Sequence, residues 1–493
     1  MELEVQIAET LTADGPAALV VPVAEGHSGP VSARLSEADA RVATPALESG
    51  LFKGKAGDVF AFPAAADGLA CVVLVGLGKD AVDAEQLRRA GGKAVEALGR
   101  HRVEMCAVDL SNSSWPCEAL LEGIVLGQYR FEKYKKPSEE NPAVSVSQFV
   151  LLGGDDAAKE RCRHAVSVCE NANWARDLGN RSSNDLTPGQ LAFEARSIAE
   201  HHECCTYDFI DEGRMLELGM NALLGVTRGA TEPAKIIILS YHCEPEAPTL
   251  AIVGKGVTFD TGGVSIKPSQ GMEEMKFDMC GAAAVLGAMR TVVQTRPPIN
   301  VVCVAPAAEN VVGSRAQKPG DIVRAYNGKT IEVNNTDAEG RLILADAMAY
   351  AVEHYQPDKM VDLATLTGAA IVALGHYAAG VMSTDDALYA SLQAVADATG
   401  ERIWRLPLWD DYCKLIEGTH GDLSNIGPAR EAGTIIGGCF LKEFVGDTPW
   451  AHIDIAGTAW GGKNIPYLNP KHATGYGVRM LSEWIRREAG VVK

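Results

Sequence analysis

Five residues with metal-binding side chains occur in three short segments of the second half of the chain. The first segment holds Lys255 and Asp260, the second holds Asp278, and the third holds Asp337 and Glu339. Their four carboxylates balance the charge of two divalent cations; such oxygen ligands suit Mn²⁺ or Mg²⁺, and Zn²⁺ accepts them. Two such ions about 3.5–4 Å apart can share a water molecule and activate it as a nucleophile. The segments therefore predict a centre with two metal ions.

Two lysines accompany the carboxylates. Lys255 lies inside the apolar run Ile-Val-Gly-Lys-Gly, where a surface lysine has no structural reason to be. Burial and adjacent cations would depress its pKa from about 10.4, so that a neutral amine could join the ligands. Lys267 then remains to stabilise a developing oxyanion.

Several of these residues also have a purely structural interpretation. Asp260 precedes Thr-Gly-Gly and could form an Asx turn, and Asp278 could cap a helix. Thr336 and Glu339 have the spacing of a capping box. These interpretations are separate from one another and leave Asp337 unexplained, whereas one metal centre accounts for the whole set.

The elements that must position these side chains follow an α/β pattern. Apolar runs typical of buried strands lie at 234–240, 249–254, 299–305, 360–364 and 452–456, and helical patterns lie at 278–294, 340–355 and 385–399. Ligands of open α/β sheets bind beyond the carboxyl ends of the strands. We therefore expect the metal centre at that edge of a central mixed sheet flanked by helices.

The first 150 residues show a second α/β pattern, and a long helical pattern follows it. Strands are expected at 17–23 and 70–76, and helices at 83–98 and 117–126. The predicted organisation is a smaller N-terminal α/β domain at 1–154, a linker helix at 155–178, and a larger catalytic α/β domain at 179–493.

Composition narrows the class of protein. The net charge is −19, from 64 acidic and 45 basic residues, which disfavours nucleic acid as the main ligand. The start of the chain is acidic and no apolar run reaches about 18 residues, so we expect a cytoplasmic protein without a membrane span. The 12 cysteines include no CxxC pair and are expected to be buried apolar residues.

The segment Asn335–Leu342, NTDAEGRL, resembles the signature of the leucyl (cytosol) aminopeptidase family. The resemblance continues through Gly254–Gly256, Lys267-Pro268, Asp362–Gly368 (DLATLTG) and His452–Gly457 (HIDIAG), and covers residues 170–493 well. The first 150 residues resemble the family's variable N-terminal domain in size and in the run from Tyr129 to Lys136.

The resemblance implies a role for each of the five metal-binding residues. Asp260 and Glu339 would bridge both metals. Lys255 and Asp278 would complete the tighter site, and Asp337 would complete the exchangeable one through its side chain and backbone carbonyl. The ions would be Mn²⁺ or Zn²⁺, two per subunit.

The resemblance also implies residues that handle the substrate. Lys267 would polarise the scissile carbonyl, and Arg341 would hold a bicarbonate ion that shuttles the proton. The substrate cleft would be lined by Thr365, Leu366 and Gly368, with Met275, Ala456 and Ala459 near the side chain of the first residue. Some members of the family carry a bulkier residue at the position of Ala459, so the depth of the pocket depends on this position.

The implied activity is release of N-terminal residues, preferably leucine and other bulky apolar residues, from peptides by a homohexamer. Two alternatives remain open. A two-metal phosphohydrolase would normally use histidine ligands, and the nearest histidine, His242, precedes the first motif strand. An additional DNA-binding or regulatory role of the N-terminal domain is known among bacterial relatives.

Overall fold

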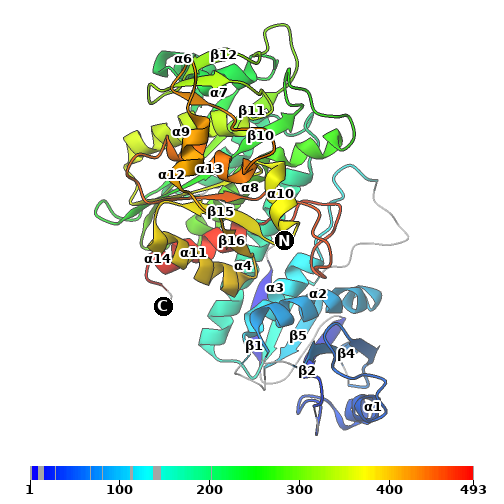
Figure 1. Cartoon of the computed structure of the whole chain (residues 1–493). Helices are drawn as coiled ribbons and strands as arrows, with labels where there is room; N and C mark the ends of the chain where they lie inside the picture. The colour runs from blue at the N-terminus through cyan, green and yellow to red at the C-terminus, as the bar shows by residue number, and fades with distance from the viewer. Residues whose placement is uncertain are drawn as a thin grey trace. The chain divides into compact units, whose positions relative to one another are not determined.

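The computed structural model describes residues 3–8, 16–27, 29–66, 68–79, 82–110, 115–136, 146–200 and 202–491 (Figure 1). The chain divides into two compact units, Met1–Asn173 with Lys463–Asn469, and Trp174–Gly462 with Pro470–Lys493. The boundary falls inside the long helix α4 (Asp156–Asn180). The acidic start of the chain, on which the cytoplasmic expectation rests, lies partly outside the described residues.

The N-terminal unit is built on a six-stranded sheet in the order β1-β6-β5-β2-β4-β3. All neighbouring strands are parallel except β3 and β4. The strands are β1 (Glu4–Ala8), β2 (Ala17–Ala24), β3 (Val59–Pro63), β4 (Leu69–Gly78), β5 (Met105–Asp109) and β6 (Gln148–Leu152), and the helices besides α4 are α1 (Glu37–Glu48), α2 (Ala84–Arg100) and α3 (Cys117–Gly127).

Helices α2 and α3 approach each other closely because glycines face the contact. A Cβ atom added to Gly91 would lie 2.2 Å from the carbonyl oxygen of Leu120, and one on Gly123 would lie 1.9 Å from that of Arg88. The buried Arg88 guanidinium forms ion pairs of 2.6 Å with both Glu85 and Glu122. A side chain at either glycine would force the two helices apart.

The larger unit is built on a nine-stranded mixed sheet in the order β16-β15-β18-β14-β9-β11-β8-β7, with β10 beside the end of β11. The four central strands β18, β14, β9 and β11 are parallel, and β15 and β8 flank them in the opposite direction. The strands are β7 (Cys205–Asp211), β8 (Lys235–Tyr241), β9 (Thr249–Gly254), β10 (Gly256–Asp260), β11 (Asn300–Asn310), β14 (Lys359–Ala364), β15 (Ala379–Ser383), β16 (Ile403–Arg405) and β18 (Trp450–Asp454). The predicted class, two α/β domains of which the larger has a mixed sheet, is confirmed.

Helices flank this sheet, as Figure 1 shows for the larger unit. Alternate residues of β9, Ala251 and Val253, share a core with Leu342 and Leu344 of α9 and with Phe440 of α13. The helices of this unit are α5 (Pro188–Glu200), α6 (Glu212–Leu218), α7 (Asn221–Thr227), η1 (Met272–Met279), α8 (Cys280–Thr295), α9 (Gly340–Tyr355), α10 (Gly368–Leu374), α11 (Asp386–Thr399), α12 (Asp410–Cys413), η2 (Lys414–Ile416), α13 (Gly433–Lys442) and α14 (Val478–Glu488).

A separate three-stranded sheet joins β12 (Asp321–Arg324), β13 (Thr330–Val333) and β17 (Leu423–Ser424). The segment that carries Asp337 and Glu339 follows β13 of this small sheet and not a strand of the central sheet. Asp278 lies in the 3-10 helix η1, so only the first of the three segments follows a strand of the central sheet directly.

The carboxyl ends of β9, β14 and β18 meet at one edge of the central sheet. The backbone N–H of Lys255 donates to the Leu363 carbonyl at 3.0 Å, and that of Ile455 donates to the Ala364 carbonyl at 2.8 Å. The start of α8 lies directly on this edge, since a Cβ atom on Gly254 would be 2.4 Å from the carbonyl oxygen of Gly281. This close approach brings the end of η1, with Asp278, to Lys255.

Across the described residues, every helix is too short or too polar to span a lipid bilayer.

Candidate metal centre

Lys255 is enclosed by three oxygen groups. Its Nζ atom lies 2.9 Å from Asp278 Oδ2, 2.8 Å from Glu339 Oε1 and 2.9 Å from the Thr365 carbonyl oxygen. Burial acts to lower the pKa of Lys255, but the charges of Asp278 and Glu339 outweigh it and raise the pKa. Lys255 is therefore an ammonium group here, and the neutral amine expected of a metal ligand requires the charge of a bound cation.

Lys267 joins the other two carboxylates. Its Nζ atom lies 2.8 Å from Asp260 Oδ2 and 2.5 Å from Asp337 Oδ1. Its side chain is 22% exposed against 3% for Lys255, so it lies at the open side of the cluster. Burial acts to lower its pKa too, and the charges of Asp260 and Glu339 again raise it.

The structure brings the four carboxylates together with an excess of negative charge. Oxygen atoms of Asp260, Asp337 and Glu339 all lie within 4.8 Å of one another. Burial raises the pKa of Asp260 and of Asp278, and Glu339 adds to this, while the two lysines act in the opposite direction. The buried Glu339 Oε2 has no hydrogen-bond partner among the described residues. Four carboxylates against two lysines, with this unpartnered oxygen, fit a site for divalent cations.

Neighbouring polar groups fix the orientation of the carboxylates. Asn310 Nδ2, at the end of β11, donates to Asp260 Oδ1 at 2.8 Å and to the Thr336 carbonyl at 3.0 Å. Thr365 Oγ1 donates to Asp278 Oδ1 at 2.7 Å. Our sequence analysis missed Asn310, although a polar residue that ends a long apolar strand was a usable signal.

The loop after β10 folds tightly around Asp260. The backbone N–H of Gly262 donates to Asp260 Oδ1 at 2.8 Å, so the Asx turn considered as an alternative role of Asp260 forms in addition to the carboxylate cluster. Gly262 and Gly263 have φ angles of +85° and +64°, where a side chain would be strained. A Cβ atom on Gly262 would also lie 2.7 Å from Asp337 Oδ1.

The two helix-capping interpretations are wrong. Thr336 Oγ1 donates to the Gly262 carbonyl at 2.7 Å and accepts from the Ser265 N–H at 2.8 Å, so it does not cap α9. Asp278 lies inside η1, and the residue before α8 is Met279, which makes no side-chain cap. Both Asp278 and Glu339 therefore contact Lys255 without holding a helix end.

Arg341 lies next to the carboxylates on α9. It is buried, its Nη1 donates to the Asn425 carbonyl at 2.6 Å, and its Nε has no hydrogen-bond partner within the described part of the chain. Burial lowers its pKa to about 10, while Glu339 and Asp454 act in the opposite direction. Its side chain thus keeps donor capacity free inside the protein.

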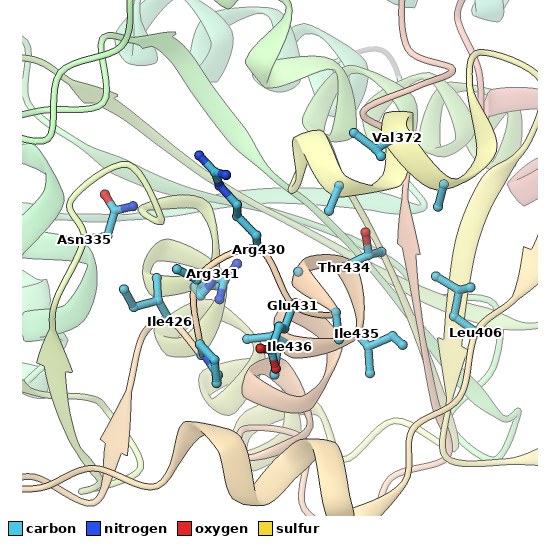
Figure 2. A pocket seen from close by; sticks show the side chains of 17 residues that line it. Asn335, Arg341, Val372, Leu406, Ile426, Arg430, Glu431, Thr434, Ile435 and Ile436 are labelled. Carbon is cyan, nitrogen blue, oxygen red and sulfur yellow. The ribbon is translucent and has the colours of Figure 1, made fainter.

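A pocket of about 710 Å³ opens beside Arg341 (Figure 2). Its wall is mostly apolar and comes from α10 and from the segment 426–436. Figure 2 shows Asn335 and Arg341 on one side of the pocket and Val372 and Leu406 on the other. The exposed residues Arg430 and Glu431 add charge to the lining.

The predicted substrate residues lie around the ends of β14 and β18. Asp454 Oδ1 accepts from the backbone N–H of Leu366 at 3.1 Å and of Ala456 at 3.2 Å, which joins these two residues. Thr365 contacts Lys255 and Asp278 as described above, and Gly368 begins α10. Asp454, which organises this part, was missed by our sequence analysis.

Met275 and Ala459 are the remaining residues that were predicted to contact the substrate. Met275 is a half-buried residue of η1, and the Phe277 ring of η1 stacks on Trp460 at 5.6 Å between ring centroids. Ala459 is buried and lines a void of only about 10 Å³ together with Cys280.

Comparison with known proteins identifies the family. Residues 173–482 match the catalytic domain of the cytosol aminopeptidase family, and residues 20–138 match the N-terminal domain of the same family. The chain belongs to the cytosol aminopeptidase family. Its substrates are therefore peptides, and it is a metal-dependent aminopeptidase, a hydrolase.

Individual relatives cover most of the chain. A probable cytosol aminopeptidase of Geobacter sp. (strain M21) is 45% identical over 427 residues, or 85% of this chain and 86% of the relative. One from Chromohalobacter salexigens is 41% identical over 486 residues, or 95% and 94%. Among solved structures, the bottromycin maturation enzyme BotP in complex with Mn matches with a TM-score of 0.84 and 32% identity, over 97% of this chain and 100% of that one.

Proposed function

We propose that this aminopeptidase uses two divalent cations and prefers leucine and other bulky apolar residues at the N-terminus of its substrates. The observation that carries the proposal is the carboxylate cluster with its unpartnered Glu339 Oε2. Asp260 and Glu339 would hold both ions, Lys255 and Asp278 would complete one site, and Asp337 the other. When bound, the ions, Mn²⁺ or Zn²⁺, supply Lewis acidity and lower the pKa of a water molecule.

The two lysines have different tasks in this proposal. Lys255 is buried between Asp278 and Glu339 and would be a neutral ligand with cations bound, because their positive charge would oppose that of the ammonium group. Lys267 is more exposed and keeps its proton. It can therefore turn from Asp260 and Asp337 toward the scissile carbonyl oxygen and stabilise the charge that develops there.

Arg341 is proposed to hold a bicarbonate ion, which would supply a proton acceptor in a centre that offers no histidine from the motif segments. Its buried guanidinium with an unpartnered Nε suits a planar oxyanion, which arginine binds through two parallel hydrogen bonds. Burial lowers the pKa of Arg341 to about 10, which still lies above neutral pH, and the carboxylates of Glu339 and Asp454 act to keep the guanidinium charged.

The substrate would lie across the edge formed by β14 and β18. Thr365, Leu366 and Gly368 would line the cleft, and the first side chain would contact the small or apolar residues Met275, Ala456 and Ala459. The rest of the peptide has room in the apolar pocket beside Arg341 (Figure 2). Each buried methylene of the first residue would favour binding by about 0.8 kcal/mol at most, which supports leucine over glycine.

Hydrolysis of three matched peptides tests the proposal. Peptides that begin with Leu, Asp or N-acetyl-Leu are compared at equal concentration, with and without a chelator. We expect fast release of Leu and slow release of Asp. Acetylation should remove most of the activity, because the free amine can no longer orient the substrate. Metal removal should also remove most of it, because the ions no longer activate a water molecule. Comparable cleavage of the acetylated peptide would reject the proposed orientation.

The family resemblance supports two further proposals, a cytoplasmic location and a homohexamer. Light scattering of the purified chain during gel filtration measures the mass directly. A mass of six subunits is expected, and a monomer would contradict the assembly.

A further inference from the structure

Two cysteines and a glutamate meet in the N-terminal unit, remote in sequence from the carboxylate cluster. Cys117 begins α3 and Cys162 lies in α4, and their Sγ atoms are 3.8 Å apart. Glu118 Oε2 lies 3.7 Å from Cys117 Sγ, and one ligand atom from each of the three residues falls within 4.8 Å of the others. The separation of 45 positions along the chain conceals this pair in the sequence.

We propose that Cys117, Cys162 and Glu118 form a Zn²⁺ site that links α3 to α4. Tetrahedral zinc binds thiolate at about 2.3 Å and carboxylate oxygen at about 2.0 Å, which sets S···S near 3.8 Å and S···O near 3.5 Å. The S···S separation of 3.8 Å matches the first value, and the 3.7 Å between Cys117 Sγ and Glu118 Oε2 is close to the second. A water molecule would complete the fourth position.

The charges around the three residues suit a dication. Two thiolates and one carboxylate carry three negative charges, Zn²⁺ neutralises two of them, and Arg161, whose Nε lies 3.6 Å from Glu118 Oε2, neutralises the third. Cys117 is also the first residue of an 11-residue helix, whose dipole favours a thiolate. The hydrogen bond between the two thiols lowers the pKa of Cys117 and raises that of Cys162.

Burial and access are both compatible with metal binding. Cys162 is fully buried and Cys117 nearly so, which protects a zinc–thiolate unit from solvent. The Glu118 side chain is 26% exposed, so a metal ion can reach the three residues from solvent on its side. Two buried cysteines alone would pack as small apolar residues; the carboxylate beside them adds the third ligand that a zinc site needs.

Cobalt titration of the full-length chain tests this site separately from the carboxylate cluster. Co²⁺ substitutes for Zn²⁺, and its thiolate complexes absorb in the near ultraviolet, whereas the proposed catalytic ligands include no cysteine. Under reducing, oxygen-free conditions we expect this band to saturate at one Co²⁺ per subunit in excess of the ions bound by the carboxylates. Zn²⁺ added afterwards should abolish the band.

Variants assign the band to its ligands. Cys117→Ser and Cys162→Ser should lose it and keep aminopeptidase activity, while Cys71→Ser, at a buried cysteine of β4 in the same unit, should keep it. Glu118→Gln, which leaves both thiols in place, should keep the band but weaken Co²⁺ binding by more than about tenfold, since even the loss of an outer hydrogen-bond partner costs 10- to 100-fold.

Three results would overturn the site. They are a wild-type protein without the band, a band of full strength in Cys117→Ser, or unchanged Co²⁺ affinity in Glu118→Gln. A disulfide between the two cysteines that survives reductant and prevents Co²⁺ binding would overturn it as well.

Discussion

Asn310 offers a sharp test of how the chain positions its carboxylates. Its amide donates to Asp260 Oδ1 and to the Thr336 carbonyl, and thereby joins the loop after β10 to the segment that carries Asp337 and Glu339. Asn310→Ala removes both hydrogen bonds but no charge. If Asp260 binds metal, this change should weaken metal binding without removing a ligand.

The expected size follows from the hydrogen bond to the carboxylate. A hydrogen bond to a charged group contributes about 1.5–3 kcal/mol, and each 1.4 kcal/mol is a factor of ten in an equilibrium constant. We therefore expect Asn310→Ala to weaken binding of the more labile ion by about 10- to 100-fold, the range found when outer partners of metal ligands are removed. With saturating metal, most of the activity should return.

Asn300 provides a matched control at the other end of the same strand. It is also buried, its Oδ1 accepts from the Cys243 N–H at 2.8 Å, and its Nδ2 donates to the carbonyls of Glu244 at 2.8 Å and Ala247 at 3.0 Å. Asn300→Ala should lower stability comparably and leave metal affinity unchanged. Competition with a chromophoric chelator measures both affinities. Equal metal affinity in Asn310→Ala and wild type, or equal loss in both variants, would refute the reasoning.

Three other predictions address the proposed centre. Lys267→Ala should lower kcat by about 10²–10³, the usual cost of one oxyanion donor, with full metal content; metal analysis that shows a lost ion would make Lys267 a ligand. Asp260→Ala and Glu339→Ala should each abolish turnover, and a variant that keeps a tenth of the rate with full metal content would contradict a shared ligand. Thr365→Val removes the hydroxyl that donates to Asp278 Oδ1 at 2.7 Å. An unmade buried hydrogen bond costs about 1–3 kcal/mol, so metal binding should weaken by about 5- to 150-fold. Unchanged metal affinity would contradict the role of Asp278 as a ligand.

The sequence predicted those elements whose pattern is long and bounded by clear signals. The strand expected at 249–254 is β9, and the helix expected at 340–355 is α9, because an apolar run or a helical period ends at glycine or at a polar residue in each case. The strands of the small sheet have only two to four residues, too few for a period to show, so β13 was not recognised as the element before Asp337.

The parts of the site that could not be predicted from the sequence depend on contacts between residues far apart in the chain. Asn310 reaches Asp260 across 50 residues because β10 pairs with the end of β11, and nothing local to Asn310 indicates that neighbour. In the same way, Asp454 at the end of β18 accepts a hydrogen bond from the backbone N–H of Leu366, which is distant in the chain. Cys117 and Cys162 were expected to be ordinary buried cysteines, and their proximity depends on how α3 meets α4.

The central claim is that Asp260 and Glu339 hold two metal ions between them. Anomalous diffraction from crystals grown with Mn²⁺ measures this directly, because manganese is located independently of the protein atoms and prefers oxygen ligands to thiolates. We expect two peaks per subunit, about 3.5–4 Å apart, both within bonding distance of Asp260 and Glu339. A single peak, or two peaks that share neither carboxylate, would contradict the account.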